Sequence, residues 1–505
     1  MGEFRFRTPN DWQLPNEVAA TIHIVGLDGV PWPCKVSWDD TTLVVSRNRE
    51  ESGRTYIGYQ TEKFGRLMVC TGSLLADHDY DLMLELARGT LNRARNQISN
   101  WGEGGLKIEA DVHQKIQTAT KHLGTSLMSR NVGERDDLAR QSIELTLEAV
   151  FELSRAFGDQ VAGYRQSHAE VERFWIACTA PSSPVFEEHA EQDTQVVAAE
   201  AKRAANENTE TLGGLIGEFS GEPFDHVRVK PEQLGGGQPL PTARPMIVGP
   251  FLDTSPGGMS QALIDCDDFR SRRSLVLNTM RNTVDSLPGN VSMLHLVSGV
   301  NGLGHRHLNY AQQLQLTVDM FNLRDELEIS APAMVSFDFP WAERLAGAVG
   351  GIHPLQVADS LLRQGIQISY LGLEMNLDYG TTGSAFRDPL QWIDLVDVWA
   401  QLAVPLVLCL RMPSGVSSET PQQSRPQQET NRNVCRPGDG FTDQQRIEIL
   451  QTVLPMMAAR PMVSGLMWQQ WSDDGDMRFP FGGLVSKEDV EKPIFEMLRQ
   501  LRKTI

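Results

Sequence analysis

The chain has 505 residues, and its 65 acidic side chains outnumber its 46 basic ones, which gives a formal net charge of −19. This negative charge argues against a nucleic-acid backbone or an anionic membrane as the main partner, because both would repel the protein at long range. No apolar run is long enough to cross a bilayer, so a membrane-spanning helix is not expected.

The first residues and the cysteines both bear on where the protein resides. Residues 1–12 lack the charged and then apolar order of a secretory signal peptide. The cysteines occur singly, with no paired spacing and no histidine at a metal-ligand distance, at Cys34, Cys70, Cys178, Cys266, Cys409 and Cys435. This usage is typical of small buried side chains in a reducing compartment. We therefore expect a cytoplasmic protein without a bound metal or cofactor.

Residues 1–80 are predicted to form a small antiparallel β-sandwich. Short segments rich in Val, Ile, Thr and Tyr are separated by Gly, Asp and Asn, which suggests about five strands. This part also contains five aromatic side chains, Trp12, Trp32, Trp38, Tyr56 and Tyr59. They could form a platform for sugar rings, as in a carbohydrate-binding domain, although alternating aromatics in a small sandwich more commonly form its core.

Residues 81–168 change to a helical period. Leu82, Leu86, Leu91 and Ala94 fall on one predicted face, and the segment 137–157 repeats the same apolar spacing. Two or three helices connecting the sandwich to the rest of the chain are expected. A structural layer is the favoured interpretation, and a groove for a partner is the alternative.

Residues 169–505 alternate apolar, strand-like runs with amphipathic helical stretches. The runs occupy 174–178, 224–230, 245–252, 292–300, 332–339, 369–377, 405–412 and 464–471. Nearly continuous apolar strands with helical crossovers indicate a parallel sheet buried on both faces, and eight such units predict a TIM barrel. The predicted fold class is therefore α/β, a (β/α)₈ barrel preceded by a β-sandwich and a helical region. A doubly wound open sheet is the alternative, but no Gly-x-Gly-x-x-Gly motif follows an early strand.

One segment interrupts this alternation. Residues 413–440 are polar, aperiodic and rich in Pro and Gln, and they directly follow the seventh predicted strand. They would form a long loop over the carboxyl-terminal mouth of the barrel. Loops of this length are lids or binding loops, or else are disordered, and the sequence does not separate the two.

Chemistry in a TIM barrel collects at the carboxyl ends of its strands. The predicted ends carry acids, amides, cations and aromatic rings, at His226, Arg228, Lys230, Asp253, Asn301, His305, His307, Asp338, Trp341, Glu374, Asn376, Asp378, Tyr379, Arg411, Trp468, Gln469, Trp471, Asp473 and Asp474. Carboxylates and amides bind sugar hydroxyls, and indole rings stack on sugar faces. We therefore expect an oligo- or polysaccharide partner. The expected binding residues are Asp253, Asn301, His305, Asn376, Tyr379, Arg411, Trp468, Gln469, Trp471 and Asp473.

Residues 240–505 resemble glycoside hydrolase family 10, the xylanase family, and more closely its divergent members from planctomycete-type bacteria. The resemblance lies in four segments in the family's order and spacing, 295–302, 365–377, 404–413 and 463–498. It implies a TIM barrel that acts on carbohydrate, with one catalytic glutamate after the fourth strand and another on the seventh.

Both of these catalytic glutamates are missing. No Asp or Glu occurs between Asp285 and Asp319 or between Asp397 and Glu419, and Leu410 or Arg411 occupies the position of the nucleophile. A retaining glycosidase needs two carboxyl groups about 5 Å apart. The standard mechanism of the family is therefore not expected here.

Two hypotheses remain. In the first, the mouth binds a glycan and hydrolysis uses other acids, with Glu374 as the best candidate because it places an acid on a buried apolar strand. Asp474, Asp473 or Asp338 would be its partner. In the second, the barrel is catalytically inactive and serves as a structural or protein-interaction module, with Glu374 and Arg411 forming an internal ion pair.

Overall fold

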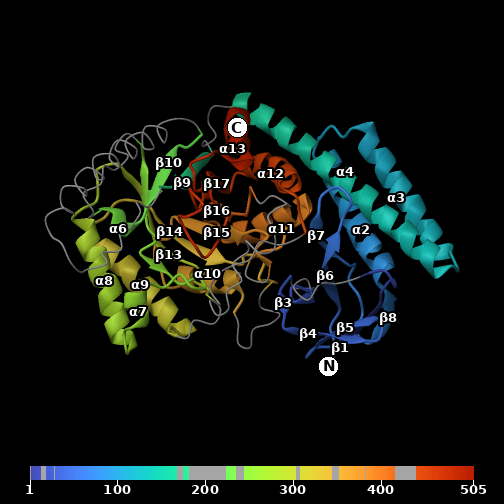
Figure 1. Ribbon diagram of the computed structural model, residues 1–505, viewed down its shortest axis with the longest axis horizontal. Coiled ribbons are helices and arrows are strands. Elements are labelled where there is room, and N and C mark those ends of the chain that lie inside the picture. Colours follow the sequence, from blue (N-terminus) through green and yellow to red (C-terminus); the bar gives the residue numbers. More distant parts are fainter. Residues whose placement is uncertain are drawn as a thin grey trace.

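The computed structural model describes residues 2–12, 19–27, 29–167, 174–180, 223–234, 244–302, 307–343, 352–380, 383–415 and 440–505. Figure 1 shows a barrel-containing part beside an amino-terminal β-rich part, with long helices running along both. None of the described helices is long and apolar enough to span a membrane.

The described amino-terminal residues form two four-stranded sheets. In order across the sheets, the first contains β4 (Cys34–Asp39), β5 (Thr42–Arg47), β1 (Gly2–Arg7) and β8 (His78–Asp81), and the second β3 (Pro31–Trp32), β2 (His23–Gly26), β6 (Gly53–Gln60) and β7 (Arg66–Cys70). The expected sandwich is confirmed, with two differences. Strands β1 and β8 were not anticipated, and they pair in parallel, whereas the other pairings are antiparallel.

Three helices follow, α2 (Leu82–Glu103), α3 (Ala110–Met128) and α4 (Val132–Ser167). The four residues expected on the inner face of α2 are all buried. Helix α4 packs against α2 and α3 and also against α11 and α12 of the barrel (Figure 1). Arg155 reinforces this docking, with its Nη2 2.8 Å from Glu448 Oε1. The helices thus pack against both the sandwich and the barrel, which also contact each other directly through Met68 and Phe386.

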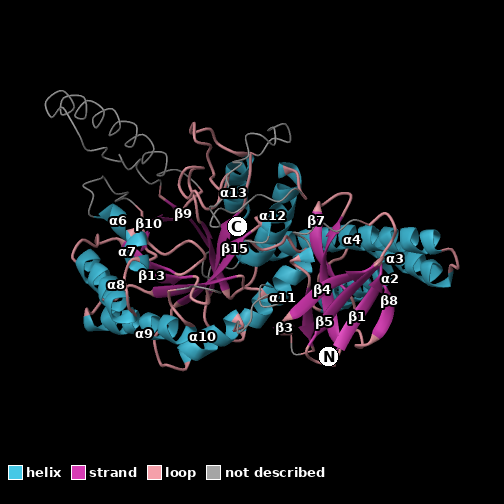
Figure 2. Cartoon of the chain, turned by 60° about the horizontal axis from the view of Figure 1, so that its bottom comes forward, coloured by secondary structure: helices cyan, strands magenta, loops and turns pink. Residues whose placement is uncertain are grey.

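The barrel strands are β9 (Trp175–Thr179), β10 (His226–Val229), β11 (Met246–Val248) with β12 (Leu252–Asp253), β13 (Val291–Ser298), β14 (Ala333–Asp338), β15 (Tyr370–Asn376), β16 (Leu406–Arg411) and β17 (Val463–Trp468). Every pairing is parallel, β17 pairs with β9, and β11 pairs with β13, so the sheet closes on itself (Figure 2). Each of the eight predicted runs overlaps a strand of the barrel, and the run 245–252 overlaps both β11 and β12. The TIM-barrel prediction is confirmed, and the open-sheet alternative is excluded.

Helices surround this barrel (Figure 2). They are α6 (Pro231–Leu234), α7 (Gln261–Ile264), α8 (Phe269–Val284), α9 (Tyr310–Glu326), α10 (Pro354–Leu362), α11 (Pro389–Ala400), α12 (Asp443–Ala458) and α13 (Pro493–Thr504). Local capping fixes where several of them begin. Helix α12 starts with a capping box in which Thr442 and Gln445 each satisfy the other's backbone N–H.

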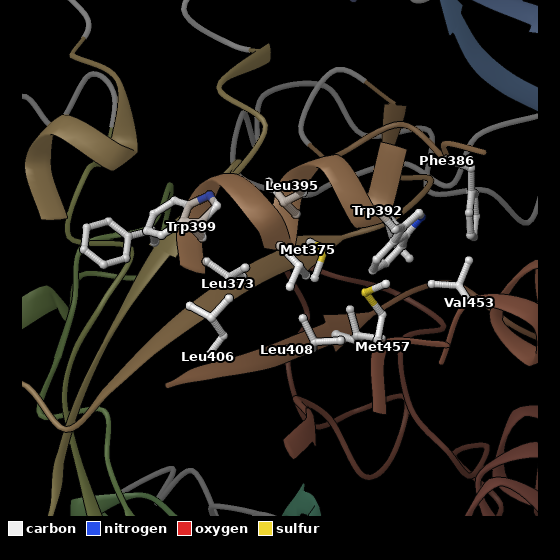
Figure 3. Close-up of a cluster of buried hydrophobic side chains, with 14 of the residues drawn as sticks. Leu373, Met375, Phe386, Trp392, Leu395, Trp399, Leu406, Leu408, Val453 and Met457 are labelled. Atoms are coloured by element: carbon white, nitrogen blue, oxygen red, sulfur yellow. The ribbon is translucent and has the colours of Figure 1, made fainter. Parts of the chain in front are cut away.

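A dense apolar layer joins α11 to the outer face of the barrel. Figure 3 shows Trp392 and Trp399 of α11 above Leu373 and Leu408 of β15 and β16. Both indole side chains are fully buried. Removing a buried Trp side chain typically costs about 3–5 kcal/mol, so this layer holds β15 and β16 rigidly in place. These two strands carry Glu374 and Arg411.

Candidate functional site

The mouth of the barrel holds a cavity of about 620 Å³. Its lining includes residues at or just beyond the carboxyl ends of five strands, Thr179 of β9, Asp253 of β12, Asn376 of β15, Arg411 of β16 and Gln469 after β17. The cavity therefore lies at the end of the barrel where chemistry was expected.

Glu374 lies at the inner end of this cavity and is 4% exposed. Its Oε1 atom accepts a hydrogen bond from Ser298 Oγ of β13 at 2.5 Å and another from Ser336 Oγ of β14. No described residue donates a hydrogen bond to its Oε2 atom. Hydrogen-bonded hydroxyls offset the cost of burying the carboxylate and leave its second oxygen available to a ligand.

A buried histidine, His295, contacts one of the two serines that bind Glu374. His295 of β13 is fully buried, and its Nε2 atom lies 2.8 Å from Ser336 Oγ. The one hydroxyl proton of Ser336 points to Glu374, so Nε2 must donate to Ser336. Burial, assisted by the positive charge of Arg228, lowers the pKa of His295 to about 3. The imidazole is therefore neutral at neutral pH, and it orients Ser336.

One side of the mouth holds a closed network of charges. Arg478 Nη2 lies 3.0 Å from Asp253 Oδ2 and 2.8 Å from Asp476 Oδ2, and Arg411 Nη2 lies 3.4 Å from the same Asp476 oxygen. Arg411 also lies over the ring of Phe479, 4.0 Å from its centroid. The expected Glu374–Arg411 ion pair is not formed, because the loop after β17 brings Asp476 to the guanidinium instead.

This network keeps its acids ionised. Burial acts to raise the pKa of Asp476, but Arg411 and Arg478 outweigh it and hold that pKa well below its ordinary value. Burial also opposes ionisation of Asp253, but Arg478 and the Ser255 hydrogen bonds lower its pKa. A glycine completes the corner, because a Cβ atom on Gly258 would lie 2.2 Å from the Asp253 carboxyl carbon. The chain can approach Asp253 this closely only without a side chain.

The other side of the mouth carries cations without such partners. Arg228 of β10 is 4% exposed, and its guanidinium donates from Nε to Thr179 Oγ1 at 2.8 Å and from Nη2 to the Gln469 carbonyl at 3.2 Å. Lys230 directly follows β10 and also lines the cavity. Burial lowers the pKa of both residues. Neither forms an ion pair with a described carboxylate.

Seven of the predicted site residues line this cavity. They are Asp253, Glu374, Asn376, Arg411, Gln469, Trp471 and Asp474. Asn376 Oδ1 lies 3.4 Å from Arg411 Nη1, and Trp471 is largely buried against Phe224 and Phe495. Asp474 is exposed and accepts a hydrogen bond from Ser472.

Asp338 and Asn301 are among the predicted residues that do not line the cavity. The Asn301 side chain clamps the backbone of Asp338, accepting from its N–H at 2.8 Å and donating to its carbonyl at 2.7 Å. The Asp338 carboxylate accepts from the N–H of Phe339 at 3.1 Å. These contacts shape the turn after β14 and favour a structural role for both residues.

Three further predicted residues also point away from the cavity. Trp468 is fully buried and donates to the Gly482 carbonyl, and buried Tyr379 donates to the Pro480 carbonyl. Asp473 forms an ion pair with Lys492, 2.5 Å from its Nζ atom. These three residues fix the loop that follows β17 and do not offer a surface to a sugar.

Some expectations fall outside the described residues. His305 and residues 416–439, most of the predicted loop over the mouth, are among them, as is Cys435. The other five cysteines are free. No group of three or more metal-ligating side chains occurs among the residues whose positions are described.

The important residues that sequence reasoning missed are Ser298, Ser336 and Arg478. The two serines lie on apolar strands, where a hydroxyl gives no sign of its partner until the strands are paired. Arg478 lies ten residues beyond the end of β17, so the strand-end rule did not reach it. Arg228 and Lys230 were recognised at a strand end but were not assigned to the site.

The fold and the site define a (β/α)₈ barrel with a polar, charged cavity at the carboxyl end of its strands. No family model and no curated protein matches the sequence. Solved structures that resemble it include native xylanase 10B from Thermotoga maritima, at 9% identity and a TM-score of 0.42, with 68% of this chain and 97% of that chain covered.

Two other xylanases match at a similar level. Xylanase 10B from Thermotoga petrophila RKU-1, solved in complex with xylobiose, has 10% identity and a TM-score of 0.40, covering 69% of this chain and 96% of that one. An endo-1,4-beta-xylanase from Penicillium canescens has 12% identity and a TM-score of 0.42, covering 68% and 97%. The likeness is limited to the fold.

Proposed function

We propose that the mouth of the barrel binds a glycan. The observation that carries this proposal is the cavity of about 620 Å³ in which a carboxylate, two amides and an indole converge, from Glu374, Asn376, Gln469 and Trp471. Sugars present many hydroxyls, which carboxylate and amide groups bind, and the edge of the largely buried Trp471 adds an apolar contact.

Binding without hydrolysis is the form of this function that the strand ends favour. Ser298 ends β13 and Arg411 ends β16, at the two strands where the family mechanism requires carboxylates. Asp253 and Asp476 are occupied by Arg478, so they do not form an acid pair with Glu374.

Hydrolysis is the second candidate, and one observation favours it. Glu374 is held by two serine hydroxyls and forms no ion pair with a described residue, so its second oxygen can reach a ligand in the cavity. Asp474 and Glu232 are the other cavity carboxylates that lack a described cationic partner, and Asp474, at the end of the barrel strands, is the candidate partner for an inverting reaction.

The test is a glycan panel, neutral and acidic, examined for binding by calorimetry and for release of reducing ends. We expect saturable binding of at least one glycan to the wild type. Glu374→Gln keeps the shape of the side chain, and Glu103→Gln is the matched control, because Glu103 is exposed at the end of α2. The control should behave as the wild type in both assays.

The outcomes separate the candidates. If Glu374 is a general acid, Glu374→Gln should lower turnover by about 100-fold or more while binding persists. Binding by both proteins without turnover in either identifies a glycan-binding barrel. If no member of the panel binds, the proposal is wrong, and the alternative of a structural or protein-interaction module gains support.

A further inference from the structure

Arg228 and Lys230 differ from the other cations at the barrel mouth because no described carboxylate contacts them. Arg228 and Lys230 occupy alternate positions at the end of β10, so their side chains project to the same face of the sheet, and both line the cavity. Arg478, in the same cavity, contacts two carboxylates. Arg228 contacts only a hydroxyl and a carbonyl.

The guanidinium of Arg228 has hydrogen-bond acceptors among the described residues for only two of its three nitrogens. Its Nε and Nη2 atoms have acceptors, but no described residue accepts a hydrogen bond from Nη1. A buried cation is costly unless it is paired. Glu374 acts on Arg228 only at longer range and is bonded to serines instead. The site would therefore gain most from a ligand that brings a negative charge.

The pKa shifts of Arg228 and Lys230 also indicate that these two cations lack a carboxylate in contact. Burial lowers the pKa of Arg228 and of Lys230, whereas Asp253 and Asp476 overcome burial and raise the pKa of Arg478 far above its ordinary value. Asp476 and Glu232 act on Lys230 only at longer range, so no described carboxylate contacts Arg228 or Lys230, whereas two carboxylates contact Arg478.

We propose that the glycan bound at the mouth is acidic, and that its anionic substituent, such as the carboxylate of a uronic acid, binds between Arg228 Nη1 and Lys230 Nζ. This inference rests on the proposed glycan-binding function. Lys230 supplies an ammonium group on a long side chain, and Arg228 supplies an N–H donor whose other donors are already anchored to β9 and to the loop after β17. The hydroxyls of the same sugar residue would then face Asn376 and Gln469.

Paired ligands test this directly. Oligogalacturonate is compared with its methyl ester, and a glucuronate-bearing xylo-oligosaccharide with the undecorated one, by calorimetric titration of the full chain. In at least one pair the acidic member should bind about tenfold more tightly, as expected for a charge-assisted hydrogen bond. Raising the salt concentration should weaken the acidic member more than the neutral one.

Variants locate the effect. Lys230→Met should remove most of the preference for the acidic member while leaving affinity for the neutral member within about twofold. Lys503→Met is the matched control, because Lys503 is exposed in the last turn of α13, and it should leave the preference unchanged. Arg228→Met is the second variant, with its folding checked by thermal unfolding.

Each outcome decides one question. If acidic and neutral members bind equally, or if the preference survives both Lys230→Met and Arg228→Met, the inference is overturned while glycan binding stands. If no glycan of either kind binds, the proposed function itself fails. Loss of the preference in Lys230→Met, with neutral binding intact, supports both.

Discussion

The two sides of the barrel mouth use the same kinds of side chain in opposite ways. On the β12 and β17 side, Arg478 joins Asp253 and Asp476 in a network that also includes Arg411. On the β10 side, Arg228 and Lys230 line the same cavity without a described carboxylate in contact. The difference teaches that charge alone does not mark a binding residue. A cation whose partners are all present stabilises the fold, and one that lacks a partner is available to a ligand.

The largest loss of stability should come from removing Arg478 from its network with Asp253 and Asp476. Arg478→Met leaves the partly buried Asp253 without a described cation and leaves Asp476 with Arg411 alone, and we expect a loss of about 3 kcal/mol in the free energy of unfolding. Lys230→Met deprives no described carboxylate of a contact and should cost less than about 1 kcal/mol. Urea unfolding of both variants measures the contrast. Equal losses would show that the two sides do not differ as described.

The pH dependence of stability should come mainly from two buried histidines, His23 and His295, and not from the charged groups at the barrel mouth. Burial lowers the pKa of His23 and His295 to about 3 in the folded protein, against an ordinary value of 6.5. The unfolded chain therefore binds more protons below pH 6.5, so stability is fully present above pH 6.5 and is lost as the pH falls toward 3. At pH 5 each histidine should account for about 2 kcal/mol.

Substitution of His295 isolates its contribution to the loss of stability in acid. Burial raises the pKa of Glu144 to about 7, which works in the opposite direction between pH 7 and 4.5 and offsets part of the loss. The contribution of Glu144 cancels when the free energies of unfolding of the wild type and His295→Gln are subtracted. This difference in unfolding free energy should shrink by about 2 kcal/mol from pH 8 to pH 5. The exposed His78 provides the control, His78→Gln. A difference that does not change with pH would mean that His295 titrates normally.

The smallest effect concerns how Glu374 is held. Ser298→Ala removes one of its two hydroxyl donors, for an expected loss of about 1 kcal/mol in unfolding free energy. Ser336→Ala removes the other donor and also the partner of His295 Nε2, so it should cost more. Thermal unfolding of the two variants gives the order, and the reverse order would contradict the described network.

Much of the fold was predictable because barrel strands are buried on both faces and therefore form continuous apolar runs. The sandwich was harder to predict. In β1 the side chains alternate, with Phe4 and Phe6 fully buried between less buried Glu3, Arg5 and Arg7, so no apolar run appears. Strand β8 reads His-Asp-Tyr-Asp, and it forms a strand because it pairs with β1.

The site was predictable only in part, for a physical reason. The strand-end rule placed Glu374, Asn376 and Arg411 at the cavity, because residues at strand ends share one rim. It could not tell which side chains turn inward, and so it included Trp468, which packs beneath the loop after β17. Nor could it assign partners. Arg411 was expected to pair with Glu374, but it pairs with Asp476, from a loop whose path depends on the folded barrel.

Calorimetric titration of the wild type, Lys230→Met and Arg228→Met with the two matched pairs of acidic and neutral ligands tests the central claim most directly. The account predicts saturable binding by the wild type, about tenfold tighter for the acidic member of at least one pair, and nearly equal affinities for the two members of that pair in Lys230→Met. Equal affinities of the wild type for the acidic and neutral members of both pairs, or a preference that persists in both variants, would contradict the assignment of the β10 side as the part of the mouth that a ligand completes.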